Sequence, residues 1–309
     1  MMEKIATRVS YGNALVELGV ADPDVVVFEA DLAEATMTKG FKAAYPDRFY
    51  EMGIAEANMV GVAAGLSACG KIPFVHSFAT FASRRCFDQI AISVCYAGLN
   101  VKIVGSDPGV GAELNGGTHM ALEDMGIMRT LPGMTVFEPT DSVQLRKALP
   151  AIVEHEGPVY IRLFRRQAEN VFDDDYEFDL GKADLLRDGS DVTLIASGVC
   201  VANALQAAET LAQEGVSARV LNIHTIKPID AEGRLRNRRA GYGGKPQRHR
   251  RARQRRCGSA GGAAAHAAGT CRRQGSFRSG GQGPLSDGRV RHHRRGHRQG
   301  GPQGHRQKV

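Results

Sequence analysis

An abrupt change of composition near Glu232 limits what this chain can fold into. Residues 233–309 hold 19 Arg, 2 Lys and 17 Gly against one acid, Asp287, so their net charge is +20. The whole chain has 40 bases and 33 acids, which leaves residues 1–232 with 19 bases and 32 acids, a net charge of −13. A segment as polar and Gly-rich as 233–309 cannot bury enough apolar surface to offset its ordering entropy. We therefore expect residues 1–232 to fold and residues 233–309 to be a disordered basic tail.

The basic tail has two further interpretations. Its charge would suit an arm that binds nucleic acid. A shifted reading frame also explains it, because Gly244–Gly261, back-translated and read one base later, is compatible with ENHNVIGGLGSAVAEVLA. Under the same shift Cys271–Arg278 and His292–Gly301 also become protein-like. We favour the out-of-frame interpretation over a selected nucleic-acid-binding arm.

Residues 1–232 alternate short apolar runs with helical patterns of small residues. Runs typical of buried strands lie at 25–28, 72–75, 101–104, 134–137 and 159–162. Helical patterns lie at about 54–68, 80–96, 120–128 and 142–153. This alternation predicts an α/β fold with a doubly wound, mostly parallel sheet. Ligands of such sheets bind beyond the carboxyl ends of the strands, which here are Glu29–Asp31, His76–Phe81, Ser106–His119 and Leu163–Arg166.

A second α/β unit begins after an acidic, aromatic stretch. We assign residues 1–168 to the first domain, 169–184 to a linker and 185–232 to the start of a second domain. Strand, helix and strand are expected at 192–196, 202–214 and 218–221. His224–Asp230 closes the last strand, and the domain is cut short where the frame is proposed to change.

Several protein classes do not fit the sequence. No apolar run is long enough for a membrane span, and the first residues lack the apolar segment of a signal peptide. Six Cys without paired spacing indicate reduced thiols, and no metal-binding motif of Cys or His is present. These features favour a cytoplasmic protein without a metal site of its own.

Four features at the expected strand ends could carry chemistry. Glu56 lies in the first turn of an apolar helix, where poor solvation favours a protonated or proton-sharing carboxyl. Stabilisation of its charge by the helix dipole is the alternative. The Phe residues of 76–87 could form an aromatic shelf or belong to the core. His119 follows Gly-Gly-Thr, and Arg162, Arg165 and Arg166 could hold an anion or form a solvated strand end.

Together with other short motifs, these residues resemble transketolase, and in particular the C-terminal subunit of a split, two-chain transketolase. The motifs occur in order along residues 5–232: Asp31-Leu, Arg48-Phe-Tyr-Glu-Met-Gly-Ile-Ala-Glu56-Ala-Asn-Met, Ser77-Phe-Ala-Thr-Phe, Phe87-Asp-Gln, Gly116-Gly-Thr-His-Met-Ala-Leu-Glu-Asp, Leu131-Pro-Gly-Met-Thr-Val, Glu138-Pro-Thr-Asp and His224-Thr-Ile-Lys-Pro-Ile-Asp. The resemblance implies a pyrimidine-binding domain and the start of the C-terminal domain.

The resemblance implies transfer of a two-carbon ketol unit from a ketose to an aldose with thiamine diphosphate. Glu56 matches the glutamate that bonds N1′ of the cofactor's aminopyrimidine. Phe81 matches the aromatic residue on that ring, and Phe78 and Phe87 are weaker candidates. His119 matches a histidine near the reacting carbons and Arg165 an arginine that holds the substrate phosphate. Asn115 and Asp31 are further candidates for substrate contacts.

Two departures from the family concern the substrate, and a missing motif concerns the partner. Asp107 stands where the family has a phosphate-binding His, and Ala35 stands near a family Ser. Because an acid opposes a dianion, a ketose with a different tail group stays open. The chain lacks the Gly-Asp-Gly…Asn motif that places Mg²⁺ and the diphosphate. An N-terminal transketolase subunit is therefore expected to supply that half, with self-association into a heterotetramer.

Other functions remain alternatives at this point. Within thiamine chemistry the chain could be similar to a 1-deoxyxylulose-5-phosphate synthase or an oxoacid dehydrogenase β subunit. Outside it, the chain could be a non-catalytic protein that binds nucleic acid through its basic tail. It could also be an inactive product whose truncated second domain exposes apolar strands.

Overall fold

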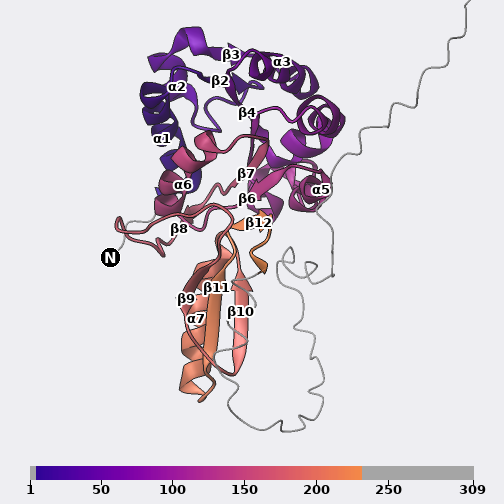
Figure 1. Ribbon diagram of the computed structural model, residues 1–309. Coiled ribbons are helices and arrows are strands. Elements are labelled where there is room, and N and C mark those ends of the chain that lie inside the picture. Colours follow the sequence, from indigo (N-terminus) through magenta and orange to yellow (C-terminus); the bar gives the residue numbers. More distant parts are fainter. Residues whose placement is uncertain (1–4, 232–309) are drawn as a thin grey trace, which may run out of the picture. The chain divides into compact units, whose positions relative to one another are not determined.

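The computed structural model describes residues 5–231 (Figure 1). The predictions made for the basic tail at 233–309 lie outside these residues. Among the described helices, none combines the length and hydropathy that crossing a membrane requires.

A seven-stranded sheet organises the first part of the chain. Its order is β12-β6-β7-β5-β4-β2-β3, and all neighbours are parallel except β12, which is antiparallel to β6. The strands are β2 (Val25–Glu29), β3 (Phe49–Glu51), β4 (Ile72–Phe78), β5 (Lys102–Ser106), β6 (Thr135–Phe137), β7 (Val159–Leu163) and β12 (Thr225–Lys227). The predicted α/β, mostly parallel fold is confirmed. Its central strands are apolar on both faces because helices cover both sides.

Two groups of helices cover the two faces of this sheet. Figure 1 shows α1 and α6 on one face and α3 and α5 on the other. The core on the first face includes Tyr11, Leu15 and Phe74, and the core on the second includes Met59, Val60 and Val75. The helices are α1 (Thr7–Ala21), α2 (Lys39–Ala44), α3 (Glu56–Ala68), α4 (Phe87–Gln89), α5 (Asp124–Thr130) and α6 (Ser142–Glu154).

The stretch expected as one helix at 80–96 is helical but not uniform. Short α4 lies between two π-helical segments, Phe81–Arg85 and Ile90–Tyr96. The Ser83 hydroxyl donates to the Ala79 carbonyl at 2.6 Å, and such side-chain bonds compete with regular helical bonding. Phe81 and Arg85 are the first and last residues of the segment that follows β4.

A smaller, three-stranded sheet follows the linker. β10 (Val192–Ala196) is parallel to β11 (Ala218–Asn222), and β9 (Asp184–Arg187) is antiparallel to β11 on its other side. Helix α7 (Cys200–Gln213) packs its Ala204, Leu205 and Ala208 on one face of this sheet. The opposite face carries Leu185 and Ile195, each 49% exposed.

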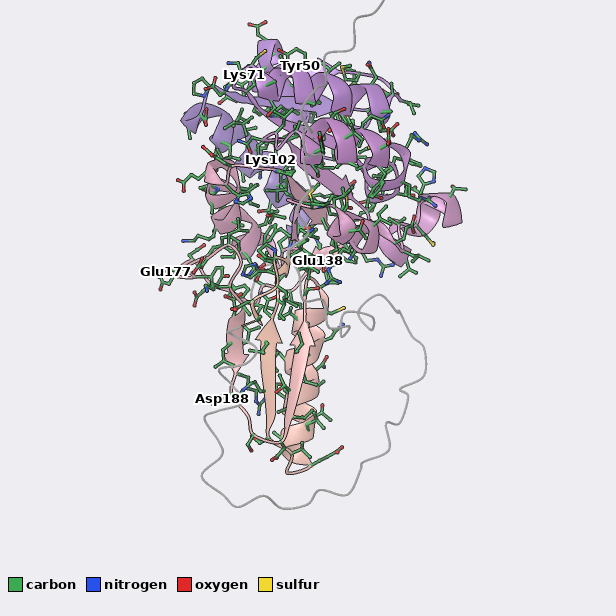
Figure 2. All side chains as sticks on the ribbon, turned by 45° about the vertical axis from the view of Figure 1, so that its right-hand side comes forward. Tyr50, Lys71, Lys102, Glu138, Glu177 and Asp188 are labelled. Atoms are coloured by element: carbon green, nitrogen blue, oxygen red, sulfur yellow. The ribbon has the colours of Figure 1, made fainter. Side chains whose placement is uncertain are left out.

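The strand β12 differs from the expectation that residues 224–230 simply close the second unit. After β11 the chain pairs β12 with β6 of the large sheet, Thr225 lying opposite Phe137. A buried ion-pair network also joins the two sheets. Arg162 bonds Asp124 at 2.8 Å and Glu138 at 2.6 Å, and the Ser197 hydroxyl donates to Glu138 at 2.7 Å (Glu138 is labelled in Figure 2).

Short pairs complete the described structure. β1 (Ile5–Ala6) pairs antiparallel with β8 (Gln167–Ala168). Directly after β1, the Thr7 hydroxyl donates to the Phe164 carbonyl and accepts from the Phe164 amide. The start of α1 is therefore fixed against the residues that follow β7.

Candidate functional site

The carboxyl ends of adjacent parallel strands bring the predicted residues to one edge of the large sheet. In register, Phe78 at the end of β4 lies opposite Ser106 of β5, and Ser106 lies opposite Leu163 of β7. Polar and aromatic side chains follow each of these strand ends. The geometry agrees with the general rule that ligands of such sheets bind at this edge.

Glu56 is buried at the first residue of α3. Its side chain is 1% exposed, its Oε1 accepts from the Ser77 hydroxyl at 3.1 Å, and both oxygens accept from Nη1 of Arg85 at 3.0 and 2.9 Å. The loop before the helix is fixed by Glu51, which accepts from the amides of Asp31 and Gly53. The sequence correctly indicated a poorly solvated carboxyl, and the structure adds an arginine partner to it.

Aromatic rings gather beside this carboxylate. The His119 ring meets Phe81 edge-on at a centroid distance of 5.1 Å and Phe78 at 5.6 Å. The Arg85 guanidinium lies 4.0 Å from the centre of the Phe81 ring, in cation–π contact. Phe78 is buried, whereas Phe81 and His119 are only half-buried. The structure therefore brings together Glu56, Phe78, Phe81 and His119.

A second polar group lies at the ends of β5 and β7. Asp107 follows β5, is 1% exposed, and its Oδ2 accepts from Nη1 of Arg165 at 3.1 Å. Burial raises the pKa of this carboxyl, while the charges of Arg165 and Arg8 act in the opposite direction. Arg8, on the first turn of α1, donates to the Ala35 carbonyl at 2.7 Å. Two guanidinium groups and one carboxylate thus meet at this part of the edge.

Other predicted residues make contacts outside these two groups. Asp31 is exposed, and its amide donates to Glu51. Asn115 ends a short helix of residues Gly109–Asn115, four positions before His119. Phe87 packs against the core cluster between α3 and the large sheet, so it does not join the ring group.

The possible anion site at residues 162–166 is only partly supported. Arg162 is 10% exposed and already bound by two carboxylates, those of Asp124 and Glu138, so it does not offer its charge to a ligand. Arg166 lies at the surface. Arg165 is the member of the run that faces the strand ends with part of its guanidinium accessible.

Sequence reasoning did not single out four residues that the structure places here. Ser77 and Arg85 bond Glu56, and Arg8 and Ser106 lie beside Asp107. Ser77 is the last residue but one of β4 and Ser106 is the last residue of β5, and such positions at strand ends can be read in sequence. Arg85 and its partner Glu56 are 29 positions apart, so local residue periodicity does not indicate their pairing.

A buried polar chain lies on the opposite face of β4 from Ser77. The hydroxyl of Tyr11 and Nε2 of His76 are 2.7 Å apart, and Nδ1 of His76 lies 4.0 Å from Oε1 of Glu29. The same Glu29 oxygen accepts from the hydroxyls of Thr36 and Thr38. Burial raises the pKa of Glu29 to about 7 and lowers the pKa of His76 to about 4.

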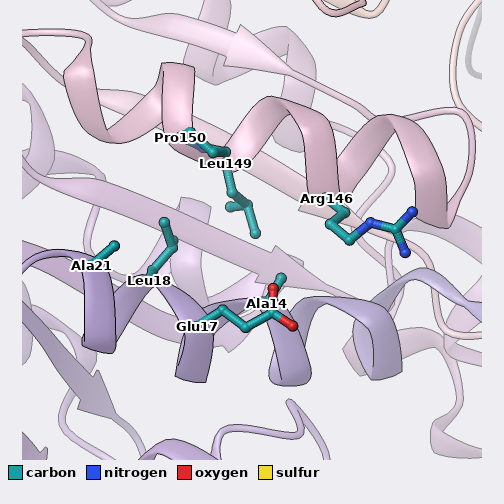
Figure 3. A pocket seen from close by; sticks show the side chains of 7 residues that line it. All are labelled: Ala14, Glu17, Leu18, Ala21, Arg146, Leu149 and Pro150. Carbon is teal, nitrogen blue, oxygen red and sulfur yellow. The ribbon is translucent and has the colours of Figure 1, made fainter. Parts of the chain in front are cut away.

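The described residues also form a small apolar hollow between α1 and α6, shown in Figure 3. It is lined by Ala14, Glu17, Leu18, Ala21, Arg146, Leu149 and Pro150. None of these residues belongs to the two groups at the strand ends. Within residues 5–231, no three His, Cys, Asp or Glu side chains are grouped so that they could hold a metal ion.

Comparison with known families decides the class of this protein. Residues 3–170 match the model of the transketolase pyrimidine-binding domain, and residues 181–237 match the transketolase C-terminal domain. The chain belongs to the transketolase family. The predicted family is confirmed. The match over residues 3–170 includes both groups of the candidate site: the ring-bearing group of Glu56, Phe78, Phe81 and His119, and the arginine-bearing group of Arg8, Asp107 and Arg165.

Relatives of this transketolase-family chain include several split enzymes. It is 57% identical over 236 residues to a 6-deoxy-6-sulfo-D-fructose transketolase subunit of Clostridium sp. (strain MSTE9), covering 76% of this chain and 73% of the relative. It is 41% identical to one of the subunits of an apulose-4-phosphate transketolase of Phocaeicola vulgatus, covering 74% and 73%. A solved structure described as a split-gene transketolase, an inactive β4 tetramer, is 48% identical with a TM-score of 0.71 and 77% coverage of each chain.

Single-chain transketolases are longer than this chain. Human transketolase is 38% identical, and the match covers 78% of this chain but only 39% of the human protein. The part matched by this transketolase-family chain is therefore well under half of a single-chain enzyme.

Proposed function

We propose that this chain is the pyrimidine-binding subunit of a thiamine-diphosphate-dependent transketolase, which transfers a two-carbon ketol unit from a ketose to an aldose. The observation that carries the proposal is Glu56, a carboxylate 1% exposed beside a group of aromatic rings. A buried carboxylate next to a half-exposed ring is the pairing that a protonatable, planar heterocycle requires. It agrees with the family to which the chain belongs.

The residues of this group fit an aminopyrimidine. Glu56 would hold a proton shared with the ring nitrogen, and Phe81 would pack on the ring with Phe78 behind it. When bound, the cofactor supplies the electron sink for cleavage of the C–C bond next to the ketose carbonyl. Ser77 orients the Glu56 carboxylate, since its hydroxyl donates to Oε1. Arg85 has to give up part of its contact with Glu56 for the pyrimidine to reach that oxygen.

The sugar is proposed to lie along the same edge of the sheet. In this proposal His119 would donate to oxygens of the reacting carbons, and Asn115 and Asp31 would contact hydroxyls of the sugar. Arg165, with Arg8 behind it, would bind a negatively charged tail. The names of two relatives support such a tail, since one acts on a sulfo-sugar and the other on a sugar phosphate.

We further propose that the enzyme is completed by a partner chain of another kind. This chain has no Gly-Asp-Gly…Asn motif, so Mg²⁺ and the diphosphate would be held by a partner that carries it. Two relatives are themselves named as subunits, and the split-gene tetramer made of one kind of chain is described as inactive. A heterotetramer of two chains of each kind agrees with these descriptions.

The shifted-frame interpretation of the tail remains part of this proposal. The match with the Clostridium relative leaves about a quarter of each chain unmatched, 24% of this one and 27% of the other, by subtraction from 76% and 73%. Two chains of similar length whose match leaves about a quarter of each uncovered agree with a frame change. The repaired frame would supply the remainder of the C-terminal domain.

The function is tested by a transfer assay with a partner. The chain, with its frame repaired after Glu232, is combined with a partner chain that carries the Gly-Asp-Gly…Asn motif, thiamine diphosphate, Mg²⁺, a ketose donor and an aldose acceptor. We expect transfer by the pair and none by either chain alone. Glu56→Gln should lower the rate at least about 100-fold, whereas Glu17→Gln, on the surface hollow of Figure 3, should not change it.

Two results would contradict the proposal. Turnover by this chain without a partner would exclude a split site. Pyruvate used as a donor in place of the ketose would instead favour the 1-deoxyxylulose-5-phosphate synthase or oxoacid dehydrogenase type of reaction.

A further inference from the structure

The arginine-bearing group at the strand ends contains a buried carboxylate, that of Asp107. Asp107 has a left-handed backbone conformation, with φ of 55°, and its amide donates to the Leu163 carbonyl at 3.1 Å. Its side chain is 1% exposed and bonded to Arg165. The negative charge is therefore fixed beside the guanidinium that is proposed to bind the substrate tail.

Polar atoms without partners also occur in this group. Among the described residues, Oδ1 of Asp107, Oγ of the adjacent Ser106 and Nε of Arg8 are buried and have no hydrogen-bond partner. They are three of nine such atoms in the described residues. Because buried polar atoms are nearly always paired in folded proteins, a polar ligand at this group would satisfy them. The two oxygens suit hydroxyl groups of a ligand, and the arginine nitrogen suits an anionic oxygen.

The charge of the group decides which anion it fits. Arg8 and Arg165 contribute +2 and Asp107 contributes −1, so the three side chains sum to +1. A phosphate monoester carries about −1.5 to −2 at neutral pH. A sulfonate has the same tetrahedral array of three oxygens but a single negative charge. The sulfonate would be neutralised by this group, whereas the phosphate would keep excess charge beside the fixed carboxylate.

We propose that Asp107 is a specificity-determining residue that makes this site select ketoses with a singly charged sulfonate tail over those with a phosphate dianion. The inference rests on the proposed function, because it assigns a substrate class to the tail site of that enzyme. Asp107 does not take part in the transfer itself. It sets the charge that the tail of the substrate has to match.

The test measures binding of small tail analogues to the full chain. Propanesulfonate and methyl propyl phosphate carry one charge, and propyl phosphate carries two at about pH 8. Binding is followed by the NMR signals of the Arg165 side-chain Nε and the Asp107 amide, because these report this site and not the basic tail. Asp107→Asn is the variant of choice, since Asn tolerates a positive φ and has the same shape. Asp174→Asn is the control, because it removes the same charge from another arginine pair, that of exposed Asp174 with Arg146.

In the wild type we expect the two singly charged ligands to bind with similar dissociation constants and propyl phosphate to bind no more tightly. Asp107→Asn should tighten propyl phosphate about tenfold and the singly charged ligands less than about threefold. Asp174→Asn should change none of them. The difference between phosphate and its methyl ester separates charge from shape.

Two results would overturn the inference. If Asp107→Asn tightens all three ligands equally, or the wild type prefers propyl phosphate, Asp107 does not select by charge. If no ligand shifts the Arg165 signal, the tail site is wrong and the inference fails with it. Neither result bears on ketol transfer, which is decided separately by the assay with the partner chain.

Discussion

Arg85 holds both carboxylate oxygens of Glu56 through a single nitrogen, Nη1, at 3.0 and 2.9 Å. The same guanidinium covers the Phe81 ring at 4.0 Å. One side chain therefore occupies the two features that the proposed function assigns to the pyrimidine, the proton-sharing carboxylate and the ring face. In the chain by itself, Arg85 stabilises a charge that would otherwise be buried without a counterion.

We expect Arg85→Met to destabilise the chain, because it leaves the Glu56 charge buried with only the Ser77 hydroxyl. The loss should be about 1–3 kcal/mol in urea-induced unfolding. Adding Glu56→Gln should recover part of this loss, since the uncompensated charge is then gone. Strictly additive effects of the two substitutions would contradict the pairing.

Arg162 should matter more to stability than a surface arginine of similar appearance. Arg162→Met leaves Asp124, 1% exposed, and Glu138, 13% exposed, without their cation. We expect a loss of about 3–5 kcal/mol on chemical unfolding. The matched control is Arg146→Met, whose partner Asp174 is 84% exposed, and which should cost less than about 1 kcal/mol. Equal losses would show that the buried ion pairs of Arg162 stabilise the chain no more than the exposed pair of Arg146.

Glu29 gives a prediction about pH. Because its pKa is raised from 4.5 to about 7 in the folded chain, the folded state holds this proton more tightly than the unfolded state. Its contribution is fully present below about pH 4.5 and is lost as the pH rises through about 7. The size is roughly 3 kcal/mol, since a tenfold difference in proton affinity between the two states corresponds to about 1.36 kcal/mol.

Glu29→Gln isolates this effect from the other buried groups. The lowered pKa of His76, about 4 against 6.5, gives the opposite slope, with stability rising as the pH rises through that interval. The difference in unfolding free energy between Glu29→Gln and the wild type should therefore move in favour of the variant between about pH 5 and 8. A constant difference across this range would show that Glu29 titrates normally.

The open face of the small sheet leads to a prediction about the C-terminal sequence. Leu185 and Ile195 are each 49% exposed on the face away from α7. Apolar strands left uncovered favour aggregation. We expect the chain with its frame repaired after Glu232 to be more soluble and to melt at a higher temperature than the 309-residue chain. Equal solubility and equal melting would count against a missing layer of structure.

Much of the large sheet could be predicted from the sequence. Runs such as 25–28 and 72–75 are apolar on both faces, and this pattern predicts buried parallel strands, now seen as β2 and β4. The helix α1 was not among the predicted elements. It buries Tyr11 and Leu15. Its Gly12 and Gly19 also face other residues so closely that a side chain would not fit there. Because glycines stand at these contact positions, the apolar periodicity that predicts a helix is weak.

Contacts that depend on tertiary structure were harder to predict from the sequence. Glu56 and the ring residues could be named because short motifs carry them. Arg85 lies four residues after Phe81, a spacing that brings side chains together on a helix, but its bond to Glu56 joins residues 29 positions apart. Arg8 is 157 positions from Arg165, and their proximity to Asp107 depends on how α1 starts beside the end of β7. No local pattern reports a juxtaposition of this kind.

The pairing of β12 with β6 has a consequence for how the chain is made. All seven strands of the large sheet have been synthesised once residue 227 has left the ribosome, and the change in composition comes five positions later. Every described residue of the ring-bearing and arginine-bearing groups lies before that point as well. The large sheet and both groups of the candidate site are therefore complete in sequence before the change in composition, and an alteration beyond Glu232 leaves each of their residues unchanged.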